Sequence, residues 1–572
     1  MVETTQIRRD LYLASLTLTN LNLFHAAKWC SEALNGLVST TEPFDFLPPP
    51  LLEDEQADQF QLLLAKNYFN CKEFLRASRA LQNCRSGNGY FFKLYSLYIS
   101  LDKQVSEELD GILHLNPKSV VQDGDGEDFA RKSLEVSGEV KKTYVSIILD
   151  AENFMKEHGQ ENSFLLYLLG IIYNRKSCPQ EAQKNLARSL ELFPYNWSCW
   201  QELFSTFTSY NDVTEFSELI RNSSSILASS VMFQMFELVA LQEFYQQQPV
   251  FEEKLTQLST IFPKFSFLDV QKFLVAYHRL DYYLAESIFD DILLNDPMRL
   301  DDLDTYSNML YVMEKKSKLS YLAQYASHID KFRSETCCVI ANYHSMKGEH
   351  DKSIMYYIRA LTLNKNCLSA WTLMGHEFVE IKNSHAAIES YRRAVDINPK
   401  DFRAWYGLGQ AYEVLDMHLY ALYFYQKATN LQPTDKRMWQ AIGNCFEKID
   451  KLEEAIQSFE KALAIDNSNK LNDGSVALSA EPHICYKLAV ISDKLGRQRE
   501  TYKYMRLCFE QELEWGITDE ISKARLWLAR HALESKRFEE AYELAKEFHL
   551  TNANSVEEAR AIAKEARSRM IK

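Results

Sequence analysis

Three short stretches carry residue types that could do chemistry. His376-Glu377 with Glu380 and His385 is similar to the zinc-binding helix of metalloproteases, and Gly407-Leu408-Gly409 could open a nucleotide loop. Asp123 to Asp128 (DGDGED) has the acidic look of a calcium loop. None fits its chemistry, because H-E-x-x-H is absent, the third glycine is missing, and the acidic run lacks the EF-hand ligand order. We therefore expect no metal, no cofactor and no catalytic centre.

The composition indicates helices as the elements that position these residues. The 572 residues include only 17 Gly and 13 Pro, which are the residues that punctuate turns and break helices. This scarcity argues against an all-β fold and against long flexible linkers. The net charge of −15, without a basic stripe, argues against a nucleic-acid partner. No apolar stretch is long enough for a membrane span, so we expect a protein without a membrane partner.

Several residue columns repeat every 34 residues, the period of tetratricopeptide (TPR) repeats, each a pair of antiparallel helices. The columns are Trp371, Trp405 and Trp439; Gly375, Gly409 and Gly443; Tyr391, Tyr425 and Phe459; Ala360, Ala394, Ala428 and Ala462; and Pro399 and Pro433. In this pattern the glycines mark places where two helices cross closely, and the aromatic column fills the space between them. The prolines end the second helix of each repeat.

The register places repeat starts at 232, 266, 300, 334, 368, 402 and 436. Weaker units near 7, 58, 92, 163 and 197, and two after 481, bring the total to about 14 repeats. The predicted fold is therefore all-α, a TPR superhelical solenoid. Three segments interrupt the period: 43–50 (PFDFLPPP), 116–138 with its acidic run, and 470–481. Because repeats cover nearly the whole chain, no block is left for a catalytic domain, and we expect a protein that is not an enzyme.

The concave face of a TPR solenoid is lined mainly by the first helix of each repeat, at positions near 2, 5, 9 and 12. The side chains at these positions are Asn308, Tyr311, Asn342, Thr372, His376, Arg403, Tyr406, Gln410, Glu413, Arg437, Gln440, Asn444 and Glu447, with Glu377 and Glu380 beside them. Amides can pair with the backbone of an extended peptide, and a carboxylate can take an arginine in a bidentate bond. The row therefore favours a peptide groove, although solvated helix surface is the alternative reading.

Four strings resemble one family more closely than a general TPR consensus does. They are Ala370 to Glu377 (AWTLMGHE), Arg403 to Gln410 (RAWYGLGQ), Tyr306 to Val312 and Glu335 to Ile340. They are similar to the subunit 8 family of the anaphase-promoting complex/cyclosome. The resemblance is strong from about residue 301 to 459 and weaker elsewhere.

This resemblance implies a non-catalytic scaffold of a multisubunit ubiquitin ligase that directs cell-cycle proteins to degradation. It implies a homodimer, contacts with other TPR and scaffold subunits, and residence in nucleus and cytoplasm. It also implies that the groove receives the C-box of an activator, a short motif with a critical arginine. Matched by position, Asn342 and Glu377 would read that arginine. The neighbouring contacts would come from Asn308, His376, Tyr406, Gln410 and Glu413.

Three regions follow from these readings: N-terminal repeats with the acidic loop at 1–231 for homodimerisation, a central array with the groove at 232–469, and C-terminal repeats with a terminal helix at 470–572. The alternative function is a TPR co-chaperone or adaptor that binds a different peptide motif. A clamp for acidic C-termini needs converging lysines and arginines, whereas position 5 holds Cys338, Thr372, Tyr406 and Gln440. An enzyme carrying TPRs is a further alternative, opposed by the missing catalytic block.

Overall fold

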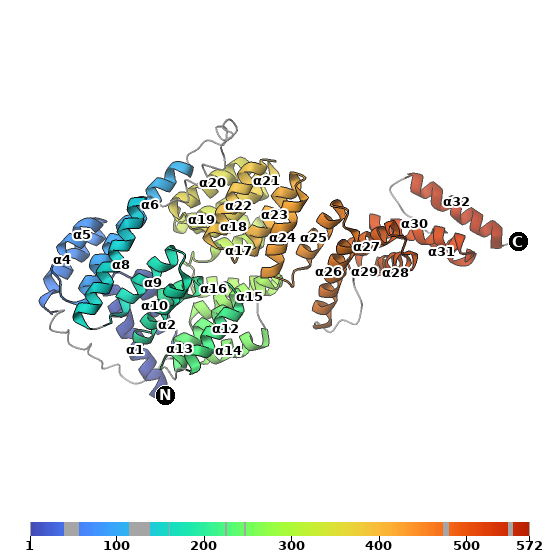
Figure 1. Ribbon diagram of the computed structural model, residues 1–572. Helices are drawn as coiled ribbons and strands as arrows, with labels where there is room; N and C mark the ends of the chain where they lie inside the picture. The colour runs from blue at the N-terminus through green and yellow to red at the C-terminus, as the bar shows by residue number, and fades with distance from the viewer. Residues whose placement is uncertain are drawn as a thin grey trace. The chain divides into compact units, whose positions relative to one another are not determined.

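The computed structural model shows a helical protein, and its described residues contain no β-strand. It describes residues 2–38, 56–113, 138–159, 161–222, 226–244, 248–472, 480–546 and 553–570. The chain divides into two compact units, Met1–Cys367 and Leu368–Lys572. Figure 1 shows the helices of both units in chain order, and each unit is described by itself below.

The first unit contains these helices: α1 (Val2–Asn20), α2 (Phe24–Gly36), α4 (Gln59–Asn70), α5 (Phe74–Ala80), α6 (Gly87–Leu113), α8 (Gly138–His158), α9 (Ser163–Arg175), α10 (Pro179–Leu192), α11 (Trp197–Ser205), α12 (Tyr210–Asn222), η1 (Ile226–Ser229), α13 (Val231–Glu243), α14 (Gln248–Ile261), α15 (Ser266–His278), α16 (Tyr282–Asn295), α17 (Leu303–Val312), α18 (Lys316–Ile329), α19 (Ser334–Met346) and α20 (His350–Leu363).

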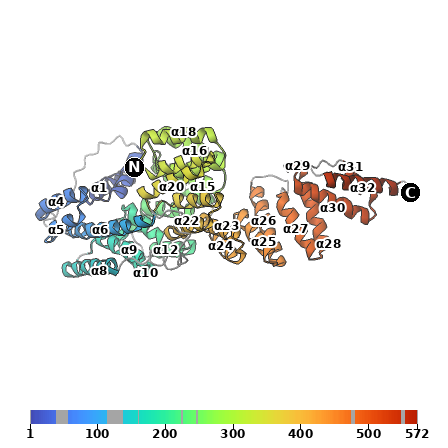
Figure 2. The same ribbon diagram turned by 90° about the horizontal axis from the view of Figure 1, so that it is seen from above.

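The second unit contains these helices: α21 (Leu368–Glu380), α22 (Ser384–Ile397), α23 (Phe402–Val414), α24 (His418–Leu431), α25 (Lys436–Lys448), α26 (Leu452–Asn472), α27 (Pro482–Lys494), α28 (Gln498–Glu510), α29 (Glu512–Trp515), α30 (Asp519–Glu534), α31 (Phe538–Lys546) and α32 (Ala553–Met570). Seen from above in Figure 2, α25 to α28 lie side by side, and each of these helices contacts the next.

The 34-residue register is confirmed at the level of single helices. The first helices α19, α21, α23 and α25 begin at Ser334, Leu368, Phe402 and Lys436, which are four of the seven predicted starts. The second helices α20, α22 and α24 begin at His350, Ser384 and His418, again 34 residues apart. α17 departs from the register by starting at Leu303 rather than at 300, and Asp302 before it has a positive φ of 64°. The all-α TPR solenoid is therefore confirmed.

The glycine column lies where helices cross, as predicted. A Cβ on Gly375 would lie 2.6 Å from Cε1 of Tyr391, and a Cβ on Gly409 would lie 2.4 Å from Cε1 of Tyr425. Gly407 touches Tyr391 from the next helix, since its Cβ would lie 2.4 Å from the same ring carbon. Tyr391 is completely buried between the two glycines. The Gly407-Leu408-Gly409 string therefore serves helix packing rather than a nucleotide loop.

The tryptophan and proline columns are joined by a hydrogen bond that the sequence analysis did not find. The indole Nε1 of Trp405 donates to the carbonyl oxygen of Pro399 at 2.8 Å, and Trp439 donates to Pro433 at 3.0 Å. In the first unit, Trp200 donates to the carbonyl of Pro194 at 2.8 Å. In each case the tryptophan of one repeat satisfies a carbonyl at the proline that ends the preceding repeat. In all three repeats the tryptophan follows the proline by six residues, and this recurring spacing could have indicated the bond from the sequence.

The N-terminal hairpin of the first unit folds back onto residues far along the chain. Trp29 of α2 stacks on Trp197, with ring centroids 4.6 Å apart. The backbone N–H of Lys264 donates to the carbonyl of Gly36 at 3.3 Å, and that of Val38 donates to Ile261 at 3.2 Å. The first unit is thus held together by contacts between distant repeats as well as between neighbours.

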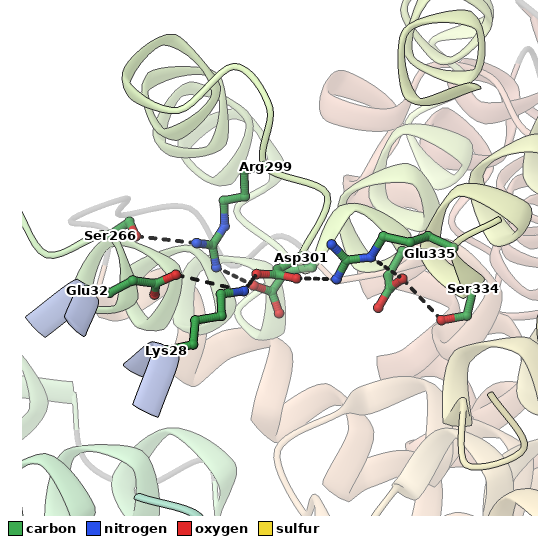
Figure 3. A network of polar contacts seen from close by, with 9 residues as sticks. Lys28, Glu32, Ser266, Arg299, Asp301, Ser334 and Glu335 are labelled. Carbon is green, nitrogen blue, oxygen red and sulfur yellow. Dashed lines mark hydrogen bonds and ion pairs between the residues drawn. The ribbon is translucent and has the colours of Figure 1, made fainter. Parts of the chain in front are cut away.

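An ion-pair network completes this closure (Figure 3). Nζ of Lys28 in α2 lies 2.5 Å from Oδ2 of Asp301, and Nη2 of Arg333 lies 2.5 Å from Oδ1 of the same carboxylate. Arg299 donates to Ser266 at 3.3 Å and pairs with Asp302 at 3.1 Å. Partial burial alone would raise the pKa of Asp301, but its two cationic partners outweigh burial and lower it.

The three regions predicted at 1–231, 232–469 and 470–572 stay a prediction beside the two compact units. The boundary at Cys367 and Leu368 falls inside the predicted central array, at the turn between α20 and α21. Of the predicted interruptions, 43–50 and the acidic run at Asp123 to Asp128 lie outside the described residues. In the third, α26 continues through Asn472, residues 473–479 lie outside the described part, and Pro482 opens α27.

Candidate peptide-binding site

The two predicted asparagines of the site belong to the first unit and hold helices together. Nδ2 of Asn308 donates to the hydroxyl of Tyr277 at 3.0 Å. Asn342 is only 2 % exposed; its Nδ2 donates to Oγ of Ser307 at 2.8 Å, and its Oδ1 accepts from the hydroxyl of Tyr357. Asn342 therefore links α17, α19 and α20. An amide can donate two bonds and accept two, so these two bonds do not use its full capacity.

His376 and Glu377 lie on α21 of the second unit, and both act on the Tyr391 hydroxyl. Nδ1 of His376 is 2.7 Å from that hydroxyl. Burial, reinforced by the charge of Arg403, lowers the pKa of His376 to about 4, so the imidazole is neutral at pH 7. Glu377 is 5 % exposed, and burial together with the charges of Glu377 and Glu380 raises the pKa of Tyr391. The pair thus combines a buried carboxylate, Glu377, with an uncharged imidazole, His376.

Tyr406, Gln410 and Glu413 come together on one face of α23, as their i, i+4, i+7 spacing predicts. Oε2 of Glu413 accepts from the hydroxyl of Tyr425 at 2.7 Å, and the rings of Tyr406 and Tyr425 lie 5.3 Å apart. The Gln410 side chain hydrogen-bonds the Tyr406 hydroxyl. All three predicted residues are partly exposed. They form a polar and aromatic surface that a ligand can reach.

The hydroxyl partners Tyr357, Tyr391 and Tyr425 were missed as functional residues, because the aromatic column was interpreted only as space filling. Each belongs to a second helix and reaches a predicted site residue on the first helix of its own repeat: Asn342, His376 and Glu413 respectively. The 34-residue spacing of these tyrosines was visible in the sequence. Their hydroxyls set the orientation and hydrogen-bonding state of the site.

Other residues of the predicted row are engaged inside the second unit. Arg403 pairs with Asp401 at 3.0 Å, and Arg437 pairs with Asp435 at 2.7 Å. Nε2 of Gln440 donates to Glu481 at 2.9 Å. Asp401 and Asp435 each also accept from the backbone N–H of their arginine, at the start of α23 and α25. These arginines are therefore held by helix-capping aspartates.

Neither a metal site nor a membrane-spanning helix is found among the described residues. They contain no group of three or more His, Cys, Asp or Glu side chains that could hold a metal ion. None of the described helices combines the length and the apolar character that crossing a membrane requires. The cysteines are free thiols, and all except Cys71 and Cys178 are buried, as expected for small core residues.

Comparison with known proteins identifies the family. The family model described as "Anaphase promoting complex subunit 8 / Cdc23" matches residues 6–273. The chain is 40 % identical, over an alignment 624 positions long, to a Saccharomyces cerevisiae protein named anaphase-promoting complex subunit CDC23, and the alignment covers 99 % of this chain and 98 % of the yeast chain. The chain belongs to the Cdc23 family. The resemblance that the sequence strings indicated is thereby confirmed.

Further matches agree with this assignment. A Cdc23-family relative from Arabidopsis thaliana, named anaphase-promoting complex subunit 8, is 35 % identical over 68 % of each chain. TPR models match residues 334–367, 375–415 and 436–469, and two of these spans begin at predicted repeat starts. A crystal structure titled as the APC/C hetero-tetramer Cut9-Hcn1 superposes with a TM-score of 0.51 over 90 % of this chain and 96 % of that chain. Its 16 % identity supports the fold alone.

Proposed function

We propose that this Cdc23-family chain is a non-catalytic scaffold subunit of the anaphase-promoting complex and supports the ubiquitination of cell-cycle proteins. The observation that carries the proposal is the match over nearly the full length of both chains to a relative named as a subunit of that complex. The series of helical hairpins in the described residues supports it, because stacked repeats present long binding surfaces. Affinity purification of the tagged chain tests it: recovery without other ubiquitin-ligase subunits would refute the assignment.

The same proposal assigns the docking of an activator C-box to the predicted row. Glu377 would take the critical arginine, because a buried carboxylate beside the Tyr391 hydroxyl favours a charge-assisted bond. Asn342 would contribute its remaining amide capacity. In the assembled complex, Glu377→Ala and Asn342→Ala should each weaken binding of a C-box peptide, whereas Glu389→Ala on α22 should not. Unchanged affinity in both site variants would remove this assignment.

Homodimerisation through the N-terminal repeats is supported by an exposed apolar face on α4 and α5. Phe60 is 82 % exposed, Leu63 59 %, Leu64 47 % and Leu75 60 %. Apolar side chains gathered in this way commonly mark a protein interface. Light scattering should show a dimer for the wild type and a monomer for Phe60→Asp combined with Leu63→Asp. Leu419→Asp, an equally exposed leucine on α24, is the control, and a variant pair that stays dimeric would refute this surface.

Residence in nucleus and cytoplasm belongs to the same proposal, because the activator and the substrates of a cell-cycle ligase must meet it there. Imaging of the fluorescently tagged chain tests it, and exclusion from the nucleus throughout the cell cycle would refute it. No observation favours the co-chaperone alternative: Arg403 and Arg437, the cations of the row, are held by Asp401 and Asp435.

A further inference from the structure

Two thiols are in contact near the end of the first unit. Cys338 belongs to α19, and Cys367 is the last residue of the first unit and directly precedes α21. Their Sγ atoms lie 3.9 Å apart, and either thiol could donate a hydrogen bond to the other. A disulfide needs a sulfur–sulfur distance of about 2.0 Å, so a small movement of the two side chains would join them.

The next two repeats do not hold cysteine at these two positions. Thirty-four residues further along the chain the positions are Thr372 and Asp401, and one repeat later they are Tyr406 and Asp435. The packing of a repeat therefore does not require a thiol at either position. The contact between two thiols is a feature of its own repeat and calls for an explanation other than the repeat pattern.

The position of Cys367 favours a negative charge. α21 has 13 residues and begins at Leu368, so Cys367 stands at its N-terminus. Asp401 and Asp435 stand at the equivalent position before α23 and α25, where each carboxylate accepts a hydrogen bond from a backbone N–H of its helix. The free N–H groups in the first turn of a helix attract an anion. A thiolate is such an anion, and it is the form of cysteine that reacts with oxidants.

The two thiols differ in their access to solvent. Cys338 is completely buried, whereas Cys367 is 9 % exposed. The hydrogen bond with Cys367 and burial both raise the pKa of Cys338, so this thiol is protonated at pH 7. An oxidant therefore reaches Cys367 first, and Cys338 is in position to react with the oxidised sulfur.

We propose that Cys367 and Cys338 form a peroxide-sensitive dithiol, in which Cys367 is oxidised first and Cys338 completes a disulfide. The Cys367 thiolate attacks one oxygen of hydrogen peroxide, the O–O bond breaks, and a sulfenic acid forms while the released hydroxide takes up the proton that Cys367 had lost. The Cys338 sulfur then attacks the sulfenic sulfur, the S–O bond breaks, and the hydroxide leaves as water with the Cys338 proton. The two thiols lose two electrons, and the peroxide is reduced to two water molecules.

The disulfide closes a loop that contains the whole of α20. One end of the loop is in α19 and the other lies directly before α21, so α20 cannot separate far from α19 while the bond is intact. α20 packs on α19 and also contacts α6. A covalent link restricts the opened chain more than the folded one, so oxidation should slow the local opening of this hairpin. The proposed scaffold function does not depend on this reaction.

The test treats the full-length chain with hydrogen peroxide, alkylates the remaining thiols and maps the peptides without reductant. The expected product is a disulfide between Cys338 and Cys367 that dithiothreitol reverses. In Cys338→Ser, Cys367 should instead accumulate as a sulfenic acid that dimedone traps, because no second thiol completes the reaction. Oxidation of the wild type should also slow amide hydrogen exchange in α20 by about tenfold or more.

Cys367→Asp is the matched control, because it introduces the residue found at the equivalent position before α23 and α25. This variant should keep the melting temperature of the wild type, and its Cys338 should stay reduced in peroxide. Cys71 and Cys178 are exposed and report that the peroxide has acted. A wild-type chain in which these two are oxidised while Cys338 and Cys367 stay reduced would overturn the proposal. A disulfide from Cys367 to Cys337 would overturn the role of Cys338.

Discussion

Gly375→Ala should destabilise the second unit, although alanine is the better helix former. Glycine costs about 1 kcal/mol relative to alanine inside a helix, so propensity alone predicts stabilisation. The added Cβ, however, would lie 2.6 Å from Cε1 of Tyr391 and 2.8 Å from both Cδ1 and Cζ. The ring cannot move away, because Gly407 contacts it from α23 and Tyr391 is fully buried.

The expected magnitude follows from these opposing effects. Overpacking a well-packed core costs about 1–3 kcal/mol, and subtracting the helix gain of about 1 kcal/mol leaves about 0–2 kcal/mol. Because Gly407 contacts the ring from its other side, we expect the upper half of this range, about 1–2 kcal/mol of net destabilisation. For a unit of this size, 1 kcal/mol corresponds to about 2–4 °C, so the melting temperature should fall by about 2–8 °C. Calorimetry measures this shift, and faster hydrogen exchange confined to α21 to α23 would place it at the Tyr391 crossing.

The control is the same substitution in a Tyr391→Leu background, where the ring is absent. There Gly375→Ala should be neutral or stabilising, because only the helix propensity remains. An unchanged or raised melting temperature for Gly375→Ala in the wild-type background would refute the reasoning. Equal destabilisation in both backgrounds would also refute it, since the cost would then arise elsewhere than at the ring.

Three further predictions concern the links between helices and between repeats. Trp405→Phe should cost about 1 kcal/mol in denaturant unfolding because the carbonyl of Pro399 loses its donor, and an unchanged free energy of unfolding would contradict this. The pKa of His376 is lowered to about 4, against an unfolded value near 6.5. The neutral imidazole therefore makes its full contribution to the free energy of unfolding above pH 6.5, and this contribution is lost as pH falls toward 4. Wild type should therefore lose more stability over this range than His376→Asn, and equal pH profiles would contradict this. A carboxyl whose pKa is lowered in the folded state stabilises that state above its unfolded pKa, and this stability is lost as pH falls through the folded pKa. Asp301→Asn should therefore weaken the fall in the free energy of unfolding of the first unit at acid pH. An unchanged fall would count against the Lys28–Asp301–Arg333 network.

The repeat was predictable because its cause is local. A glycine every 34 residues opposite an aromatic side chain reports a close helix crossing, and the structure places Gly375, Gly409 and Gly443 against Tyr391, Tyr425 and Phe459. The periodic spacing also predicted which residues share a helix face, as for Tyr406, Gln410 and Glu413. Both kinds of inference need only the geometry of one helix and its neighbour.

Other features could not be predicted because residue type does not determine them. The turn between the two helices of a repeat needs a positive φ, which the sequence supplies with Gly348 in one repeat but with Lys382, Asp416 and Asp450 in the next three. Asn342 is buried against Ser307 and Tyr357, and neither residue is at one of the repeat positions predicted to line the concave face. The contact of Lys28 with Asp301 joins residues 273 positions apart, beyond the reach of any periodic pattern.

That long-range contact affects how the chain is made. A ribosome adds about 5–20 residues per second, so roughly 15–55 s pass between the synthesis of Lys28 and that of Asp301. For the part of this interval before Trp197 and Phe265 have been synthesised, the apolar surface of α2 around Trp29 is uncovered. The N-terminal hairpin, although translated first, is among the last parts of the first unit to be completed, and nascent chains should need chaperone protection until Phe265 has emerged.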